Sequence, residues 1–189
     1  MTQRKYISNL VVVSTIITQV AIGCRSVWEY KPETTCGVNY ISLPYVSNKS
    51  RAGQCGIIAI EQLLYKFKKV KPGQIKYHRL PRGIFANTLN LVFFAKENGL
   101  SCELTKMNIN ELYKELNESR PVIIVVPPGS TWFARRFSKI LAAHCIVVVG
   151  YSNDKIYFYS DGSGLYFIEK EHLLFLWENM DNVAIRILT

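Results

Sequence analysis

Cys55 is the residue whose type and position most favour chemistry. It opens an apolar stretch that predicts a helix over residues 55–68, and a helix N-terminus offers unpaired N–H groups and partial positive charge. Both stabilise a thiolate, so the thiol becomes a working nucleophile. A small buried core residue is the alternative interpretation. Gln54 either donates its amide to an oxyanion or is a solvated residue at the helix start, and Gly56 leaves space for a substrate backbone.

A base for this thiol is available in His144, one of three histidines. His144 directly precedes an apolar strand, residues 145–151, and a strand end holds an imidazole rigidly; a capping or core histidine is the alternative. Asp161 ends the next predicted strand, residues 155–160. Because antiparallel neighbours place the start of one strand beside the end of the other, we expect Asp161 next to His144, where it would orient the imidazole. A turn residue is the alternative for Asp161.

The elements that must position these residues predict one α+β domain over residues 41–189. Hydrophobic periodicity and turn residues predict helices at 55–68, 86–98, 109–117 and 170–179, and strands at 122–126, 145–151, 155–160, 165–168 and 183–188. Residues 41–46 alternate and contain proline, which indicates an extended edge. In the second helix we expect Leu89, Val92, Phe93 and Ala95 to face inward. This order predicts N-terminal helices packed on a mostly antiparallel sheet.

The N-terminus predicts an export signal. Two basic residues precede an interrupted apolar stretch, residues 10–23, which is shorter than the roughly 20 residues of a spanning helix. It ends at Cys24, as in a bacterial lipoprotein signal whose cysteine is acylated; a plain secretory signal and an uncleaved anchor are the alternatives. We therefore expect a signal peptide over 1–23, a tether over 24–40, and an exported protein anchored by lipid to a membrane of a bacterial cell envelope.

Composition narrows the classes of protein. The chain has 189 residues, 49% of them hydrophobic and 20% charged, which excludes a largely disordered chain, a collagen and a heptad rod. The net charge is +9, and removal of residues 1–23 takes away two positive charges and leaves +7. A basic protein can bind nucleic acid, an anionic membrane or an acidic partner. No run of five basic residues occurs, so we expect a solvated surface beside an anionic bilayer and no nucleic-acid partner.

The remaining cysteines show no metal-ligand spacing. An exported chain can form disulfides. If Cys24 carries lipid and Cys55 is a working thiol, an odd number is left. At most one disulfide then forms among Cys36, Cys102 and Cys145, and the spacing does not select the pair.

Together these motifs resemble the papain-like cysteine peptidases of the bacteriocin-processing (double-glycine leader, C39-like) family, most of all its stand-alone lipoprotein branch. The resemblance covers roughly residues 41–189. It rests on these segments: Gly53-Gln54-Cys55-Gly56 before an apolar helix, His144 with Val147–Tyr151, Asp161-Gly162, Tyr77–Gly83, and Trp177 with Val183–Ile185.

The resemblance implies a papain-like fold in which Cys55 is the nucleophile, His144 the base and Asp161 the residue that orients it. A glutamine upstream of the cysteine contributes to the family's oxyanion hole, which implies that role for Gln54, although the family's glutamine stands several residues earlier.

Two further positions differ from the family pattern. Ile57 and Gly162 stand where the family usually has proline. Because the second change adjoins Asp161, Asp154 and Asn153 are alternatives for the orienting residue.

The chemistry implied is acyl transfer by a cysteine peptidase acting on a peptide or protein, with no metal or cofactor. Two other classes stay open. One is a catalytically idle, lipid-anchored binding or assembly factor on the same fold. The other is a transglutaminase-like or amidase-like acyl transferase. Residues 127–134 either close over the site or form a surface loop. The sequence gives no indication of oligomeric state.

Overall fold

The computed structural model describes residues 40–46, 54–68, 70–71, 73–77, 88–127, 143–160, 162 and 164–188. The expected signal peptide, nearly all of the tether, and both Cys24 and Cys36 lie outside these residues. Within them, no helix combines the length and the apolar character needed to cross a bilayer.

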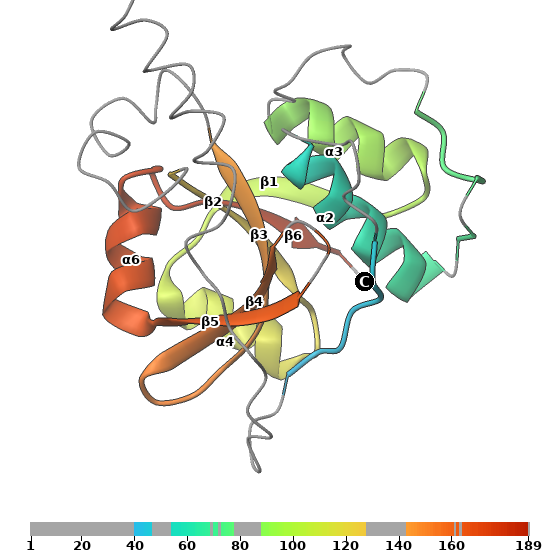
Figure 1. Ribbon diagram of the computed structural model, residues 1–189. Helices are drawn as coiled ribbons and strands as arrows, with labels where there is room; N and C mark the ends of the chain where they lie inside the picture. Colours follow the sequence, from blue (N-terminus) through green and yellow to red (C-terminus); the bar gives the residue numbers. More distant parts are fainter. Residues whose placement is uncertain are drawn as a thin grey trace, which may run out of the picture.

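A six-stranded antiparallel sheet forms the centre of the domain, in the order β1-β6-β2-β3-β4-β5 (Figure 1). The strands are β1 (Cys102–Lys106), β2 (Val122–Val126), β3 (His144–Tyr151), β4 (Lys155–Ser160), β5 (Gly164–Glu169) and β6 (Val183–Ile187). The helices are α2 (Cys55–Leu63), which continues as a π-helical segment η1 (Leu64–Lys68), then α3 (Thr88–Glu97), α4 (Ile109–Asn117) and α6 (Lys170–Glu178).

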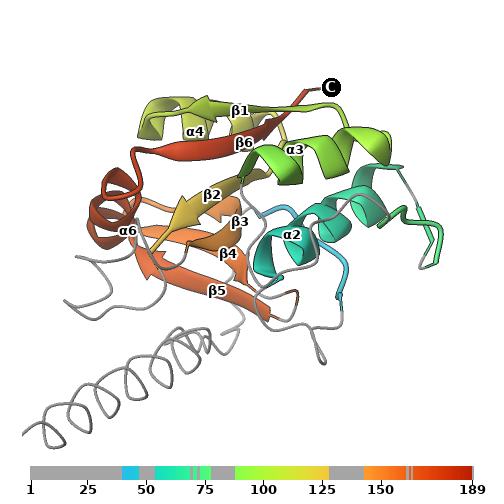
Figure 2. The same ribbon diagram turned by 90° about the horizontal axis from the view of Figure 1, so that it is seen from above.

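The helices cover both faces of the sheet, with α2 and α3 on one face and α4 and α6 on the other (Figure 2). Successive residues of a strand point to opposite faces, and β3 shows this clearly. Cys145, Val147 and Val149 join the core under α2, whereas Ile146 and Val148 join the core under α6. A strand buried on both faces has to be apolar throughout, which accounts for the continuous apolar runs of β2 and β3.

Helix α2 is buried along its whole length after its first residue. Its two polar residues, Glu61 and Gln62, are each 1% exposed and are hydrogen-bonded. The Gln62 amide donates to the carbonyl of Pro44 at 3.2 Å, and the Tyr77 hydroxyl donates to the Glu61 carboxyl at 2.6 Å. Buried polar groups need such partners. These hydrogen bonds therefore hold the segments that contain Pro44 and Tyr77 against the helix that carries Cys55.

The segment 41–46 runs extended across the domain, as its sequence predicts. Its Ile41 N–H donates to the carbonyl of Val149 at 2.8 Å, and its Val46 N–H donates to the carbonyl of Gly162 at 3.1 Å. Gly162 has φ +71°, and a Cβ there would lie 2.3 Å from the Val46 oxygen. Proline is fixed near φ −65°. This backbone therefore requires glycine where the resembling family usually has proline.

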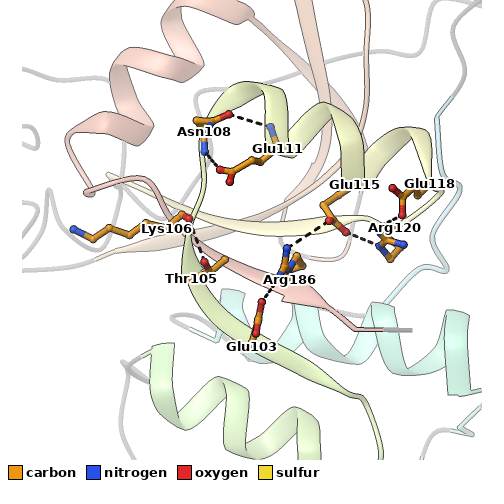
Figure 3. Close-up of polar contacts among 9 residues, drawn as sticks. All are labelled: Glu103, Thr105, Lys106, Asn108, Glu111, Glu115, Glu118, Arg120 and Arg186. Carbon is orange, nitrogen blue, oxygen red and sulfur yellow. Dashed lines mark hydrogen bonds and ion pairs between the residues drawn. The ribbon is translucent and has the colours of Figure 1, made fainter.

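Most predicted elements are confirmed within one or two residues of their ends. The predicted 109–117 helix has its capping box, with the Asn108 side chain accepting from the Glu111 N–H at 3.0 Å and the Glu111 carboxyl accepting from the Asn108 N–H at 2.7 Å (Figure 3). The helix predicted at 86–98 ends as expected at Gly99, which has φ +84°.

Two expectations are wrong. Leu89 and Phe93 of α3 are 55% and 64% exposed, and the helix instead buries Leu91 and Phe94 beside Val92 and Ala95. Because α3 is apolar on several sides, its sequence offers more than one apolar stripe, and contacts with α2 and β1 select the buried one.

The strand β1 was not predicted either. It is a sheet edge whose polar residues give weak alternation, so it enters the sheet through pairing with β6.

A cluster of charged side chains joins β1, β6 and α4 (Figure 3). Arg186 of β6 lies between Glu103 of β1 and Glu115 of α4, with its guanidinium 3.8 Å from the Glu115 carboxyl. Glu115 is 5% exposed and also accepts a hydrogen bond from Arg120 at 2.5 Å. Arg120 pairs with the exposed Glu118 as well. A buried carboxylate with two cationic partners ties the helix to the sheet edge.

Glu115→Ala should lower the free energy of unfolding by about 1–3 kcal/mol, because it removes the buried carboxylate that Arg120 and Arg186, both only partly exposed, share as an acceptor. The matched control is Glu118→Ala, which removes a 44%-exposed partner of the same arginine and should cost less than about 1 kcal/mol. Urea unfolding of both variants measures the two values. Equal losses would contradict the assigned role of Glu115.

Candidate active site

The N-terminus of α2 presents Cys55 at the edge of the core. The helix begins after Gln54, which has φ −102° and ψ 24° and whose carbonyl accepts the Ile58 N–H at 3.0 Å. The Gln54 side chain makes no capping bond. The first N–H groups of the helix therefore lie beside the thiol without a side-chain cap, which favours a negative charge on sulfur. Cys55 is half-buried.

Strand β3 brings two residues to this thiol. Cys145 donates its backbone N–H to the Cys55 sulfur at 3.4 Å, across 90 residues of sequence. His144, the residue before it, lies close enough to the Cys55 thiol for its side chain and positive charge to lower the pKa of that thiol. The start of β3 thus brings His144 near the start of α2, and the catalytic pairing of Cys55 with His144 stays a prediction.

The His144 imidazole is held from its other side by Ser160. Its Nε2 atom lies 2.9 Å from the Ser160 hydroxyl oxygen, and the two residues are 9% and 2% exposed. Ser160 is the last residue of β4 and pairs in register with Ile146. The expected adjacency of the start of β3 and the end of β4 is thus confirmed. This adjacency brings the Ser160 hydroxyl to His144, and the sequence pattern did not single out Ser160.

A β-bulge decides that Ser160 reaches this position. Gly150 pairs with Tyr157, but Val148 pairs with Phe158, so the register shifts by one residue between them. Continuing the first register would place Asp161 opposite Ile146. With the bulge, Ser160 takes that place, because a shift of one residue exchanges the two faces of a strand.

The surroundings hold the pKa of the Cys55 thiol well below its ordinary value. The largest cause is the hydrogen bond with the Cys145 side chain; burial acts in the opposite direction and raises the pKa. The hydrogen bond and positive charge of His144, and the Cys145 N–H, lower it further. Cys102 provides the contrast, because burial raises the pKa of its thiol. Of these two thiols, Cys55 is therefore the one that ionises more readily.

Gly56 has a different role from the expected one. A Cβ at this position would lie 2.4 Å from Cδ1 of Leu91 and 3.3 Å from the Cys145 sulfur. The space that glycine leaves is therefore filled by α3 and by β3. The missing side chain allows α2 to approach the sheet closely, which is what brings Cys55 to Cys145.

The other candidate residues, together with the two remaining histidines His78 and His172, fall into three groups according to where they lie in the structure. Asp161 lies outside the described residues, as do His78 and residues 128–134 of the loop. Asn153 and Asp154 belong to the turn that joins β3 to β4 at the opposite end of β3 from His144. His172 lies on α6, which covers the opposite face of the sheet from α2.

Two features of the site were missed from the sequence. Ser160 was not singled out, and Cys145 was not assigned to the site. Each directly adjoins a residue that was singled out, Asp161 and His144 respectively. Adjacency to a candidate residue on a strand is the signal that would have found them. No group of histidine, cysteine and acidic side chains suited to a metal ion occurs among the described residues.

No protein-family model and no curated protein matches this sequence. Several solved structures are similar to the chain, and two of them are described here. One is a protein from Bacillus anthracis described as a C39-like peptidase, with 20% identity and a TM-score of 0.43, over 53% of this chain and 57% of that one. The other is a double-glycine-motif protease from an AMS/PCAT transporter, in complex with the leader peptide. It shares 17% identity over 80% of this chain and 95% of its own length, with a TM-score of 0.56.

The second similarity establishes the fold. The helices α2 and α3 and the six-stranded antiparallel sheet together have the papain-like fold of a C39 peptidase domain. By its fold, the chain resembles the C39-like, double-glycine-motif cysteine peptidases, at low sequence identity.

The lowered pKa of Cys55 predicts a particular pH dependence of alkylation. A thiolate that persists below the ordinary pKa of 9.0 keeps the iodoacetamide reaction fast at neutral pH, and the rate falls only at more acidic pH. His144→Ala removes a hydrogen bond and a charge that lower the pKa, so at pH 7 the rate should fall about tenfold.

The control is His172→Ala, which should leave the alkylation profile of Cys55 unchanged. Rates at Cys55 and Cys102 are measured by mass spectrometry of the alkylated peptides. An unshifted profile in His144→Ala would show that the imidazole does not stabilise the thiolate.

Proposed function

We propose that this chain is a cysteine peptidase in which Cys55 is the nucleophile and His144 the general base and acid. The observation that carries the proposal is the position of Cys55 at the start of α2 against the start of β3, where the Cys145 N–H donates to the Cys55 sulfur at 3.4 Å and His144 is the residue next to Cys145. A thiol whose pKa is lowered by an imidazole at a helix N-terminus is the arrangement that nucleophilic catalysis by cysteine requires.

The proposed reaction is acyl transfer to water. The Cys55 thiolate attacks the carbonyl carbon of a peptide bond, and the negative charge moves to the carbonyl oxygen. The backbone N–H of Cys55 and the side chain of Gln54 are the proposed donors to that oxygen. His144, protonated in the resting pair, gives its proton to the leaving amine. It then takes a proton from a water molecule, whose oxygen attacks the acyl carbon. The acyl group leaves as a carboxylic acid, and the Cys55 thiolate and the protonated His144 are restored.

Ser160 is the proposed positioning residue for His144, alongside Asp161 as the acidic residue of the resembling family. Since Nε2 of the imidazole is hydrogen-bonded to the Ser160 hydroxyl, Nδ1 is the nitrogen left to exchange a proton with Cys55. A buried hydroxyl on Nε2 holds the orientation of the imidazole ring.

The proposed substrate is a peptide. One structure of similar fold was solved with a leader peptide bound, which supports an extended peptide as the first probe. A set of synthetic peptides with a Gly-Gly pair before the scissile bond, beside matched peptides with Ala-Ala, tests both cleavage and this preference.

The purified full chain should cleave at least one of these peptides, and Cys55→Ala should reduce the rate by roughly 10³-fold or more, because it removes the attacking atom. Mass spectrometry of the products locates the cleaved bond. Cys102→Ser is the control, since its side chain lies in the core, away from Cys55.

Other outcomes would favour the other two classes. Incorporation of an amine into a glutamine peptide, with no cleavage, would indicate an acyl transferase. Binding of peptides without cleavage, together with a Cys55 thiol that alkylates only in denaturant, would indicate a binding or assembly factor.

Ser160→Ala should lower kcat by about 10- to 100-fold and leave KM nearly unchanged, because a misoriented base affects the chemical step more than binding. Ser160→Thr keeps the hydroxyl and should restore most of the activity. A purely structural role would lower folded protein and activity together in both variants. The measurements are steady-state kinetics across pH, with thermal unfolding of each variant.

A further inference from the structure

A second thiol lies directly against the proposed nucleophile. Cys145 contacts Cys55 through its backbone N–H, which donates to the Cys55 sulfur at 3.4 Å, and the Cys145 side chain also lowers the pKa of the Cys55 thiol. Its sulfur also lies 3.3 Å from the position of a Cβ on Gly56, the residue after Cys55. The Cys145 sulfur is therefore packed against the first turn of α2, beside the Cys55 sulfur.

The two thiols differ in access. Cys55 is half-buried at the edge of the core, whereas Cys145 is 6% exposed. A small oxidant from solvent thus meets Cys55 first, and oxidation is favoured at a sulfur with thiolate character. The inner sulfur is shielded from direct oxidation but remains in contact with the outer one.

We propose that Cys55 and Cys145 form a reversible disulfide when the protein meets hydrogen peroxide, with Cys145 as the resolving thiol. This pair is then a redox modification site that is formed by two neighbouring elements, α2 and β3. The formation of the disulfide rests on the geometry of the two thiols. Its consequence, that oxidation switches the enzyme off, rests on the proposed peptidase function.

The chemistry proceeds in two steps. The Cys55 thiolate attacks one oxygen of the peroxide, so a sulfur–oxygen bond forms and the oxygen–oxygen bond breaks. Sulfur loses two electrons, and the departing hydroxide takes a proton from the His144 imidazolium to become water. The Cys145 sulfur then attacks the sulfenic sulfur of Cys55. A disulfide bond forms, and the hydroxyl leaves as water with the proton of Cys145. Two thiols and one peroxide thus give one disulfide and two water molecules.

The sheet order excludes the competing pair of core cysteines. Cys102 lies on β1 and Cys145 on β3, with β6 and β2 between them. Three spacings of about 4.8 Å separate these strands by about 14 Å, whereas a disulfide needs Cα atoms within about 7 Å of each other. Among the cysteines that the structure describes, Cys55 is therefore the partner available to Cys145.

The test uses the full chain treated with hydrogen peroxide, followed by mass spectrometry of unreduced peptides and by alkylation before and after dithiothreitol. We expect a peptide linked through Cys55 and Cys145. Alkylation of Cys55 should be lost on oxidation and almost fully restored by dithiothreitol. In Cys145→Ser the same treatment should carry Cys55 on to sulfinic acid, with about tenfold less alkylation recovered after reduction.

Cys102→Ser is the matched control and should behave as the unchanged chain. If Cys145→Ser fails to fold, the linked peptide in the unchanged chain still decides the question. Absence of that peptide, with Cys55 oxidised irreversibly to the same extent in the unchanged chain and in Cys145→Ser, would overturn the proposal. These readouts require no peptidase activity. A linked peptide in a protein that cleaves nothing would contradict only the proposed function.

Discussion

The contact between the first turn of α2 and the first two residues of β3 is the constraint on which the rest of the structure depends. It places the Cys55 sulfur against the Cys145 N–H and the His144 imidazole. The close approach requires a residue without a side chain at Gly56 and a helix that can be buried on every side. The buried polar residues Glu61 and Gln62 are compatible with that burial because segments outside the helix satisfy them.

A one-residue irregularity determines which group stands behind the histidine. The bulge between Val148 and Gly150 shifts the pairing of β3 with β4, so Ser160 pairs with Ile146 and its hydroxyl reaches the imidazole. A β-bulge re-aims every side chain beyond it. The composition of the site therefore depends on backbone geometry several residues further along β3.

The two faces of the sheet differ in what they carry: one carries the candidate site and the other a closed core. The face under α2 and α3 carries Cys55, Cys145 and the core that positions them. The opposite face, under α4 and α6, is a closed core that includes Trp177, whose indole N–H donates to the Val183 carbonyl at 2.9 Å. The cluster around Arg186 fixes α4 to the sheet edge. This separation allows the Cys55 thiol to occupy a partly exposed position while His144, Cys145 and the strand that carries them stay buried.

The sequence by itself determined nearly all the helices and strands, the α+β class, and the candidate pair Cys55 and His144. These depend on local patterns, such as periodicity, a capping box and the residue type at an element's start. The tertiary structure alone decided the buried face of α3, the presence of β1, and the position of Ser160 and Cys145 at the site. Each of these depends on which element lies opposite and in which register. Contacts between residues far apart in the chain set that register, and no local pattern encodes it.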